Sequence, residues 1–352
     1  MTECQIGDTR IMIKKNNTVI KIKHKNSRTK KTYSISEYIS RMSYVDNATG
    51  EGDTLDVTFV GTNKFLDKYY PGENDLLYCD IEKYSDSGQR KKLVNNQSFH
   101  IDSVSFDGLT SCTMKAISTP PNNCFAKTPR TKTYKKTTLK NIATIIAKRT
   151  GVKLHYSANT INIKKIKQNK ETDCSFLYSL CQNYGVAMKI YADKLVLFSE
   201  EKYDKKKSVA VINPTSLIEG SFSCDVDLIH QYTGFKFNYK IDKKRTAYWW
   251  LKFTKIKPLI FVDIGECDSE SDGFIKGCAK VNEANKNMQV VRFEVPGSAK
   301  YVAAACITLT GFYVAINGKY YINQVIHNYD SDSGYTCSIE ARRIQTRLKR
   351  KK

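Results

Sequence analysis

The segment from Thr137 to Ser199 constrains the fold more than any other, because it is a helical island in a sequence that otherwise alternates like β-strands. The stretch TTLKNIATIIAKRTGVKLHY opens with two threonines that can cap a helix. It continues with Leu139, Ile142 and Ile146 at helical spacing and then meets Gly151, a residue that ends helices. This pattern predicts a helix, a glycine stop and a short strand.

The same order then repeats in the second half of the island. Asp173 is the expected N-cap of a second helix, and Gly185 is its expected end. The stretch VAMKIYADKLVLFS follows and predicts two strands across an Ala-Asp turn. The island therefore has the order helix–glycine–strand twice in about sixty residues, which is close to the smallest size that folds alone. The apolar face of the second helix contains Phe176, Leu177, Leu180 and Cys181.

The 352 residues are too many for one ordinary core, so two or three domains are expected. The flanks of the island are predicted to be β-domains. Period-two segments before the island favour a small antiparallel barrel or sandwich, and three strand candidates begin a second β-domain after it. Asn16-Asn17 predicts a hairpin turn, and residues 63–70 predict a short helix. Residues 117–136 are expected to be an extended linker, and residues 269–287 a weak helix.

The sequence contains no recognisable catalytic, cofactor or metal motif. Its eleven cysteines form no CxxC pair, and its five histidines are scattered. HExxH, a P-loop and a Ser-His-Asp phrase are all missing from the sequence. We therefore expect reduced thiols, with Cys174 and Cys181 packed on one helical face, and a structural or interfacial role for His327.

Positive charge is unevenly distributed along the chain. The formal net charge is +22, and no acidic residue occurs between Gly108 and Lys170. Lys132, Lys135 and Lys136 cluster before the first helix of the island and are candidate partner-interface residues. Such a patch attracts polyanions, but dedicated nucleic-acid motifs are missing, so nucleic acid is not expected as the primary ligand. Acidic partner subunits and a simply solvated surface are the other two interpretations.

The densest aromatic spot is Tyr248-Trp249-Trp250. It is expected either to pack partly in a core or to form an exposed anchor for a partner, and the three residues are candidate interface residues. No apolar run has the roughly 20 residues of a membrane-spanning helix, and the N-terminus lacks the apolar core of a signal peptide. We therefore expect synthesis in a host cytoplasm and no membrane insertion.

The island resembles the middle of the phage late control protein D family. These are baseplate hub proteins of contractile tails, related to the T-even phage baseplate hub and to the hub region of the VgrG spike. The shared phrase is a helix ending in Gly, then Gln, an acidic residue, Asp, an aromatic-Leu pair, and a second helix ending in Gly. Its positions here are Gly151, Gln168, Glu171, Asp173, Phe176, Leu177 and Gly185.

Both flanks match the same family in the same order, although Phe65 and Tyr70 stand where the family often has Trp. The matching positions before the island are Tyr44, Asp46, Asp53, Leu55, Tyr70, Pro71, Gly72, Phe99, Ile101 and Asp102. Those after it are Pro296, Gly297, Gly311, Phe312, Gly318, Tyr321, Ile322, Val325, His327, Gly334, Tyr335 and Thr336.

The resemblance implies a mainly β fold with a small α/β insert (α+β), in which two small antiparallel β-barrel domains flank the helix–strand island. We expect the first, tube-like barrel in residues 1–120, and a linker with the small α/β domain in 121–205. The second barrel is expected in 206–352, with a helical or loop insertion around 254–290 and a basic C-terminal tail.

The implied function is structural and non-enzymatic, without a cofactor. A homotrimer would present six similar barrels to a sixfold tail tube on one side and to a threefold central spike on the other. Tape-measure and baseplate wedge proteins are further expected partners, and the expected location is the tail baseplate of a virion or tail-like particle. A VgrG-like secretion spike hub is the nearest alternative. A peptidoglycan hydrolase and a basic nucleic-acid-binding protein are the alternatives from other classes.

Overall fold

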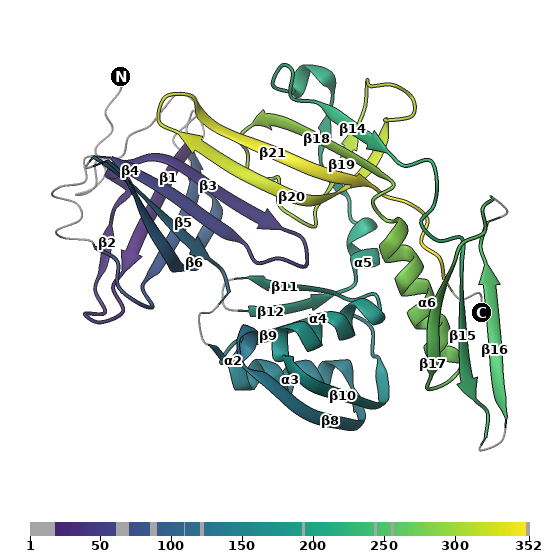
Figure 1. Ribbon diagram of the computed structural model, residues 1–352. Coiled ribbons are helices and arrows are strands. Elements are labelled where there is room, and N and C mark those ends of the chain that lie inside the picture. The colour runs from purple at the N-terminus through teal and green to yellow at the C-terminus, as the bar shows by residue number, and fades with distance from the viewer. Residues whose placement is uncertain are drawn as a thin grey trace.

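The computed structural model describes residues 18–60, 70–84, 90–108, 110–119, 123–191, 194–242, 245–254 and 257–349. Strands dominate and helices are few, which confirms the mainly β, α+β class. Figure 1 shows a large sheet, the island beneath it, and a projecting arm made of β15, β16, β17 and α6. The predicted hairpin turn at Asn16-Asn17 and nearly all of the short helix predicted at 63–70 lie outside the described residues.

The large sheet corrects the expectation of two separate barrels. Among the described residues no sheet closes into a barrel, and strands from both flanks of the island pair in one thirteen-stranded sheet. The strands before the island form a first section of this sheet, and the strands after it form a second section. The two sections are joined where the edge strand β3 of the first pairs with the edge strand β20 of the second. The first section contains β1 (Thr18–Lys25), β2 (Thr32–Ser34), β3 (Ile39–Asn47), β4 (Thr54–Val60), β5 (Leu76–Tyr84), β6 (Arg90–Asp107) and β7 (Ser111–Ile117), with a 3-10 turn at Ser36–Tyr38.

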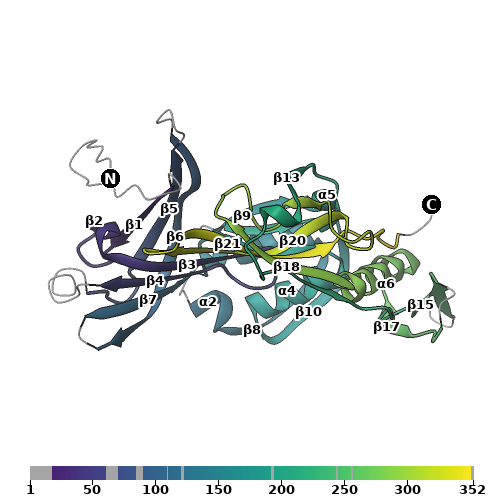
Figure 2. The ribbon, with the colours of Figure 1, turned by 90° about the horizontal axis from the view of Figure 1, so that it is seen from above.

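The second section continues the same sheet and the same core. Its buried side chains, including Val325 and Tyr320, belong to one apolar cluster with Leu55 and Phe99 of the first section. Figure 2 shows that the arm projects at the end of the molecule opposite β1 and β2. The second section contains β13 (Ser208–Ile212), β14 (Ser223–Val226), β18 (Gln289–Pro296), β19 (Cys306–Leu309), β20 (Gly318–Asp330) and β21 (Gly334–Arg343), with a 3-10 turn at Pro214–Ser216.

The island has its own core and the predicted helices. In the first of these, Thr138 accepts a hydrogen bond from the Asn141 amide as N-cap, and Gly151 ends the helix with φ +74°. The predicted linker is only partly a linker, because its second half forms a strand that pairs with β10. The elements are α2 (Asn123–Ala126), β8 (Pro129–Thr138), α3 (Leu139–Thr150), β9 (Lys153–Ser157), β10 (Asn162–Thr172), α4 (Asp173–Asn183), β11 (Ala187–Tyr191), β12 (Lys194–Phe198) and α5 (Glu200–Asp204).

In the arm, a long helix packs on a three-stranded sheet. The strands are β15 (Gly234–Lys240), β16 (Thr246–Lys252) and β17 (Phe261–Cys267), in the order β16-β15-β17, and the helix is α6 (Glu270–Asn285). A Cβ atom added at Gly277 would lie 2.3 Å from the ring of Phe235, so glycine lets the helix approach the sheet closely. None of the described helices has the length and apolar character needed to cross a bilayer.

Candidate functional site

Lys189 projects from β11 of the island between two carboxylates of the large sheet, and these three residues are called the junction below. Its Nζ forms ion pairs with Asp46 in β3 and with Asp53, whose Oδ1 lies 3.0 Å away. The fully buried Asp53 also accepts hydrogen bonds from the Asn47 amide at 3.1 Å and from Gln97 Nε2 at 3.0 Å. The cation of the mostly buried Lys189 therefore holds the island against the sheet.

The ionisation of the junction follows from its burial. Burial raises the pKa of Asp53 to about 6, against the attraction of Lys189. Burial acts to lower the pKa of Lys189, but the attraction of Asp46 and Asp53 outweighs it and the pKa lies above its ordinary value. Lys189 thus stays charged at neutral pH, while Asp53 titrates at a pH slightly below neutral.

A second buried group lies next to the junction on the large sheet. His327 is directly opposite Tyr44 in the β20–β3 pairing, and their rings stack with centroids 5.4 Å apart. His327 Nδ1 lies 2.7 Å from the Tyr335 hydroxyl and 3.4 Å from Cys337 Sγ. Burial lowers the pKa of His327 to about 4 and raises the pKa of the Cys337 thiol. A catalytic cysteine needs an accessible thiolate, so this geometry supports a structural role for the pair.

Asp173 organises the interior of the island rather than capping its helix, contrary to the prediction. Thr172 is the N-cap and accepts a hydrogen bond from the Ser175 amide at 3.2 Å, because it has the extended backbone that a cap requires. The carboxylate of Asp173 is fully buried and accepts hydrogen bonds at 3.0 Å from both Arg149 and Gln168. This network fixes α3, β10 and α4 relative to one another.

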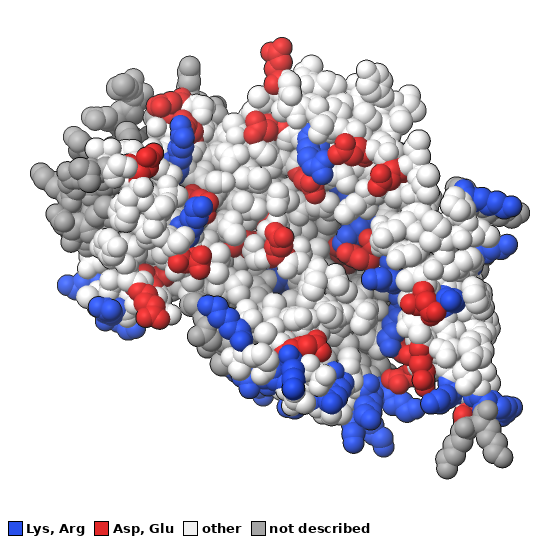
Figure 3. All heavy atoms as spheres, in the orientation of Figure 1, with Lys and Arg blue, Asp and Glu red and all other residues white. Residues whose placement is uncertain are grey.

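The three predicted interface lysines, Lys132, Lys135 and Lys136, all lie exposed on β8. With β10 this strand forms a two-stranded antiparallel ribbon, in which Lys135 is directly opposite Lys165. Figure 3 shows Lys and Arg gathered on the lower part of the molecule, over the island. The lysines of β10 were not among the predicted interface residues, although INIKKIKQNK alternates them with isoleucines in a strand-like pattern. They are Lys164, Lys165, Lys167 and Lys170.

The aromatic spot lies on β16 of the arm, and its side chains remain accessible. Tyr248 is 72% exposed and Trp250 63%, and Trp250 contacts Phe261 edge-on at 5.7 Å. Trp249 points to the other face of the strand, where its ring lies 5.6 Å from that of Phe274 in α6. The anchor interpretation thus suits Tyr248 and Trp250, and the packing interpretation suits Trp249. The arm and the ribbon remain separate surfaces.

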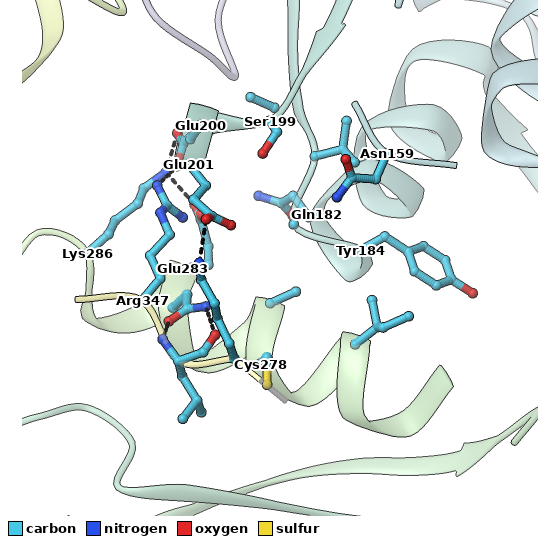
Figure 4. A pocket seen from close by; sticks show the side chains of 18 of the residues that line it. Asn159, Gln182, Tyr184, Ser199, Glu200, Glu201, Cys278, Glu283, Lys286 and Arg347 are labelled. Carbon is cyan, nitrogen blue, oxygen red and sulfur yellow. Dashed lines mark hydrogen bonds and ion pairs between the residues drawn. The ribbon is translucent and has the colours of Figure 1, made fainter. Parts of the chain in front are cut away.

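A cavity of about 370 Å³ lies between α4, α6 and the C-terminal tail (Figure 4). Arg347 of the tail donates to Glu200 at 3.0 Å and to Asp204 at 2.7 Å. Burial acts to raise the pKa of Glu200, but Lys286 and nearby arginines outweigh it and lower the pKa. The charged stretch EEKYDKKK is therefore partly a buried ion network, which composition alone did not indicate. Across the described ranges, no group of His, Cys, Asp and Glu is arranged to hold a metal ion.

The chain has clear relatives by structure although not by sequence. No protein-family model matches it, and no curated protein matches its sequence. It is similar to the 43 kDa tail protein of prophage MuSo2 from Shewanella oneidensis, with 14% identity and a TM-score of 0.65, covering 92% of this chain and 98% of that one. It is also similar to a tail protein from Neisseria meningitidis, with 10% identity and a TM-score of 0.68, covering 92% and 96%.

A third similar structure comes from a secretion system. An E. coli protein described as a component of the type VI secretion system, structurally similar to the T4 bacteriophage tail proteins gp27 and gp5, matches with 10% identity and a TM-score of 0.55. That match covers 89% of this chain and 76% of the other. The chain thus has the fold of these phage tail proteins.

Proposed function

We propose that this chain is a structural hub of a contractile phage tail or tail-like injection particle. It forms a trimeric ring that adapts a sixfold tail tube to a threefold central spike, within the tail baseplate. The observation that carries the proposal is the end-to-end likeness to the Shewanella tail protein, which covers 98% of that protein at only 14% identity. Tail-tube and spike proteins are the primary partners, and tape-measure and wedge proteins are further candidates.

The continuous sheet supplies a physical rationale for symmetry matching. One chain carries two β-sections joined through β3 and β20, so three chains present six sections around a closed ring. Within the described part of the chain, β13 pairs only with β19 and exposes Val211, which is 63% accessible. Such an edge is available for contacts between copies.

Light scattering of the purified protein, alone and with its candidate spike, tests the assembly. We expect a mass near three times the 40.1 kDa of one chain, retained at high salt because apolar contacts are not screened. A persistent monomer in the presence of the spike contradicts the adaptor role.

A VgrG-like hub of a secretion device is the second candidate, favoured by the likeness to the E. coli type VI component. Both candidates require a ring and a spike, so the mass alone does not separate them. Purification of the assembled particle does, because a phage tail or tail-like particle is recovered free of the cell, whereas a secretion device is anchored to the cell envelope.

The arm provides a more local prediction for the proposed assembly. Replacing Tyr248 and Trp250 together by alanine is expected to leave the melting temperature nearly unchanged, because both side chains are mostly exposed. Exposed aromatic anchors contribute about 2 kcal/mol or more to an interface, so co-assembly with tube and spike should weaken roughly thirtyfold. Tyr313→Ala, at a tyrosine that is 83% exposed in the loop between β19 and β20, is the control. Full co-assembly of the double variant would show that the arm is not an interface.

A further inference from the structure

The β8–β10 ribbon has one face on the helices and one face in solvent. Tyr134 is buried, and Ile166, directly opposite it, packs against the same core. Because strand side chains alternate, the neighbouring positions point outward. Lys135 and Lys165, again directly opposite each other, therefore share the outward face with Lys167. All three side chains are exposed.

This lysine face is electrostatically unfavourable in the isolated chain. Like charges directly opposite each other in an antiparallel pair destabilise it, as Lys135 and Lys165 do here. Within the ranges that the structure describes, neither these two lysines nor Lys167 forms an ion pair with a carboxylate of this chain. The only acidic residue on the two strands is Glu171, near the end of β10. Among the described residues, no ion pair therefore compensates the charge of these three lysines.

The inward face of the ribbon, which packs on the helices, holds the backbone of the lysines in place. The ring of Tyr134 stacks on Phe176 of α4 with centroids 5.7 Å apart, and Ile163 is buried in the same cluster. Arg130, at the start of β8, lies 3.6 Å from the buried Asp173 carboxylate. The lysine backbones are therefore held by the core of the island. Charges that are ordered in advance lose less entropy when a partner binds.

We propose that the outward face of the ribbon, carried by Lys135, Lys165 and Lys167, is the docking surface for an acidic β-strand face of a partner protein. This rests on the proposed function, in which the chain assembles with other proteins of the particle. Lys165 and Lys167 are two residues apart on one strand, about 7 Å along it, and carboxylates at alternate positions of a partner strand have the same spacing. The match in sign and spacing identifies the chemistry of the partner.

A protein partner fits this face better than nucleic acid. The charged residues of the outward face are lysines, and the nearby Arg130 and Arg149 are engaged by Asp173. Arginine is the residue that recognises phosphate and guanine through two parallel hydrogen bonds. The aromatic ring of the ribbon, Tyr134, is buried and offers no stacking platform for bases.

Fluorescence anisotropy with the full chain tests the proposal, using a labelled peptide of alternating glutamate and threonine and a DNA duplex of equal charge. Reversing all three lysines (Lys135→Glu, Lys165→Glu and Lys167→Glu) should weaken peptide binding at low salt by about tenfold or more. The matched control reverses three exposed lysines outside the ribbon, at Lys207, Lys252 and Lys280, and lowers the net charge equally. The control should retain peptide binding within about twofold.

A single reversal separates docking from a role in stability. Lys165→Glu places opposite charges across the strand pair, so the melting temperature should stay the same or rise while peptide binding falls. Equal losses in the ribbon and control variants would overturn the proposal in favour of unspecific net charge. Tighter binding of the duplex than of the peptide at the same salt would assign the ribbon to nucleic acid. The peptide-binding assay does not depend on trimer formation. The ribbon proposal and the proposed trimeric hub can therefore be contradicted independently of each other.

Discussion

Replacing Lys189 by methionine is expected to lower the free energy of unfolding by about 3 kcal/mol, because two buried carboxylates lose the cation that they share. Asp53 is fully buried and its hydrogen bonds from Asn47 and Gln97 do not replace a counter-charge. Urea unfolding followed by circular dichroism measures the loss. The control is Lys194→Met on the adjacent strand β12, where the side chain is exposed and the change should stay within about 0.5 kcal/mol.

The cost of Lys189→Met should depend on pH in a defined direction. The pKa of Asp53 is already raised to about 6 with the lysine present, and it rises further without it. A carboxyl whose pKa is higher in the folded than in the unfolded state gains stability as pH falls through the folded value. The loss is therefore largest near pH 8 and shrinks toward pH 5. A loss below about 1 kcal/mol that is equal at both pH values would contradict the junction as a buried charge site. Asp53→Asn in the Lys189→Met background should recover part of the loss.

Much of the local structure follows from the sequence because it depends on neighbouring residues. Both island helices and the strand alternation were predicted and are confirmed, since periodicity acts within a few residues. Gly151 caps the first helix and Gly185 follows the C-cap of the second, each with positive φ, whereas the predicted N-cap Asp173 was wrong. The helix predicted at 269–287 is also confirmed, but the residues that it buries could not be read from its weak periodicity. The structure buries Gly273 and Gly277, because two phenylalanine rings of β15 lie against them.

The long-range arrangement could not be read in the same way. Nothing local shows that β3 pairs with β20 and joins two expected barrels into one open sheet, because strand pairing is decided by distant partners. The junction illustrates the same limit. Asp46 and Asp53 belong to phrases that marked the resemblance, yet their partner Lys189 lies far away in the island hairpin. An aspartate in an alternating strand is predicted to face solvent, and only the position of Lys189 shows that Asp46 is buried.

The phrases Pro296-Gly297 and Gly334-Tyr335 are linked by one close contact, which the sequence did not reveal. A Cβ atom added at Gly297 would lie 2.0 Å from the ring of Tyr335. The Gly297 amide also donates to the Tyr335 carbonyl at 2.9 Å, so the backbone has no room to retreat. The ring is buried, and its hydroxyl lies 2.7 Å from His327 Nδ1. Glycine is therefore required at position 297 because any side chain there would collide with the Tyr335 ring.

Gly297→Val is accordingly expected to destabilise the protein by about 3 kcal/mol, because the new side chain must displace a buried ring and break its contact with His327. Thermal and urea unfolding measure this loss. In a Tyr335→Ala background the same change should cost less than about 1 kcal/mol, since the ring that it meets is gone. Equal costs in both backgrounds would show that Gly297 is needed for its backbone conformation. A smaller cost in the Tyr335→Ala background would instead show that Gly297 is required to make room for the Tyr335 ring.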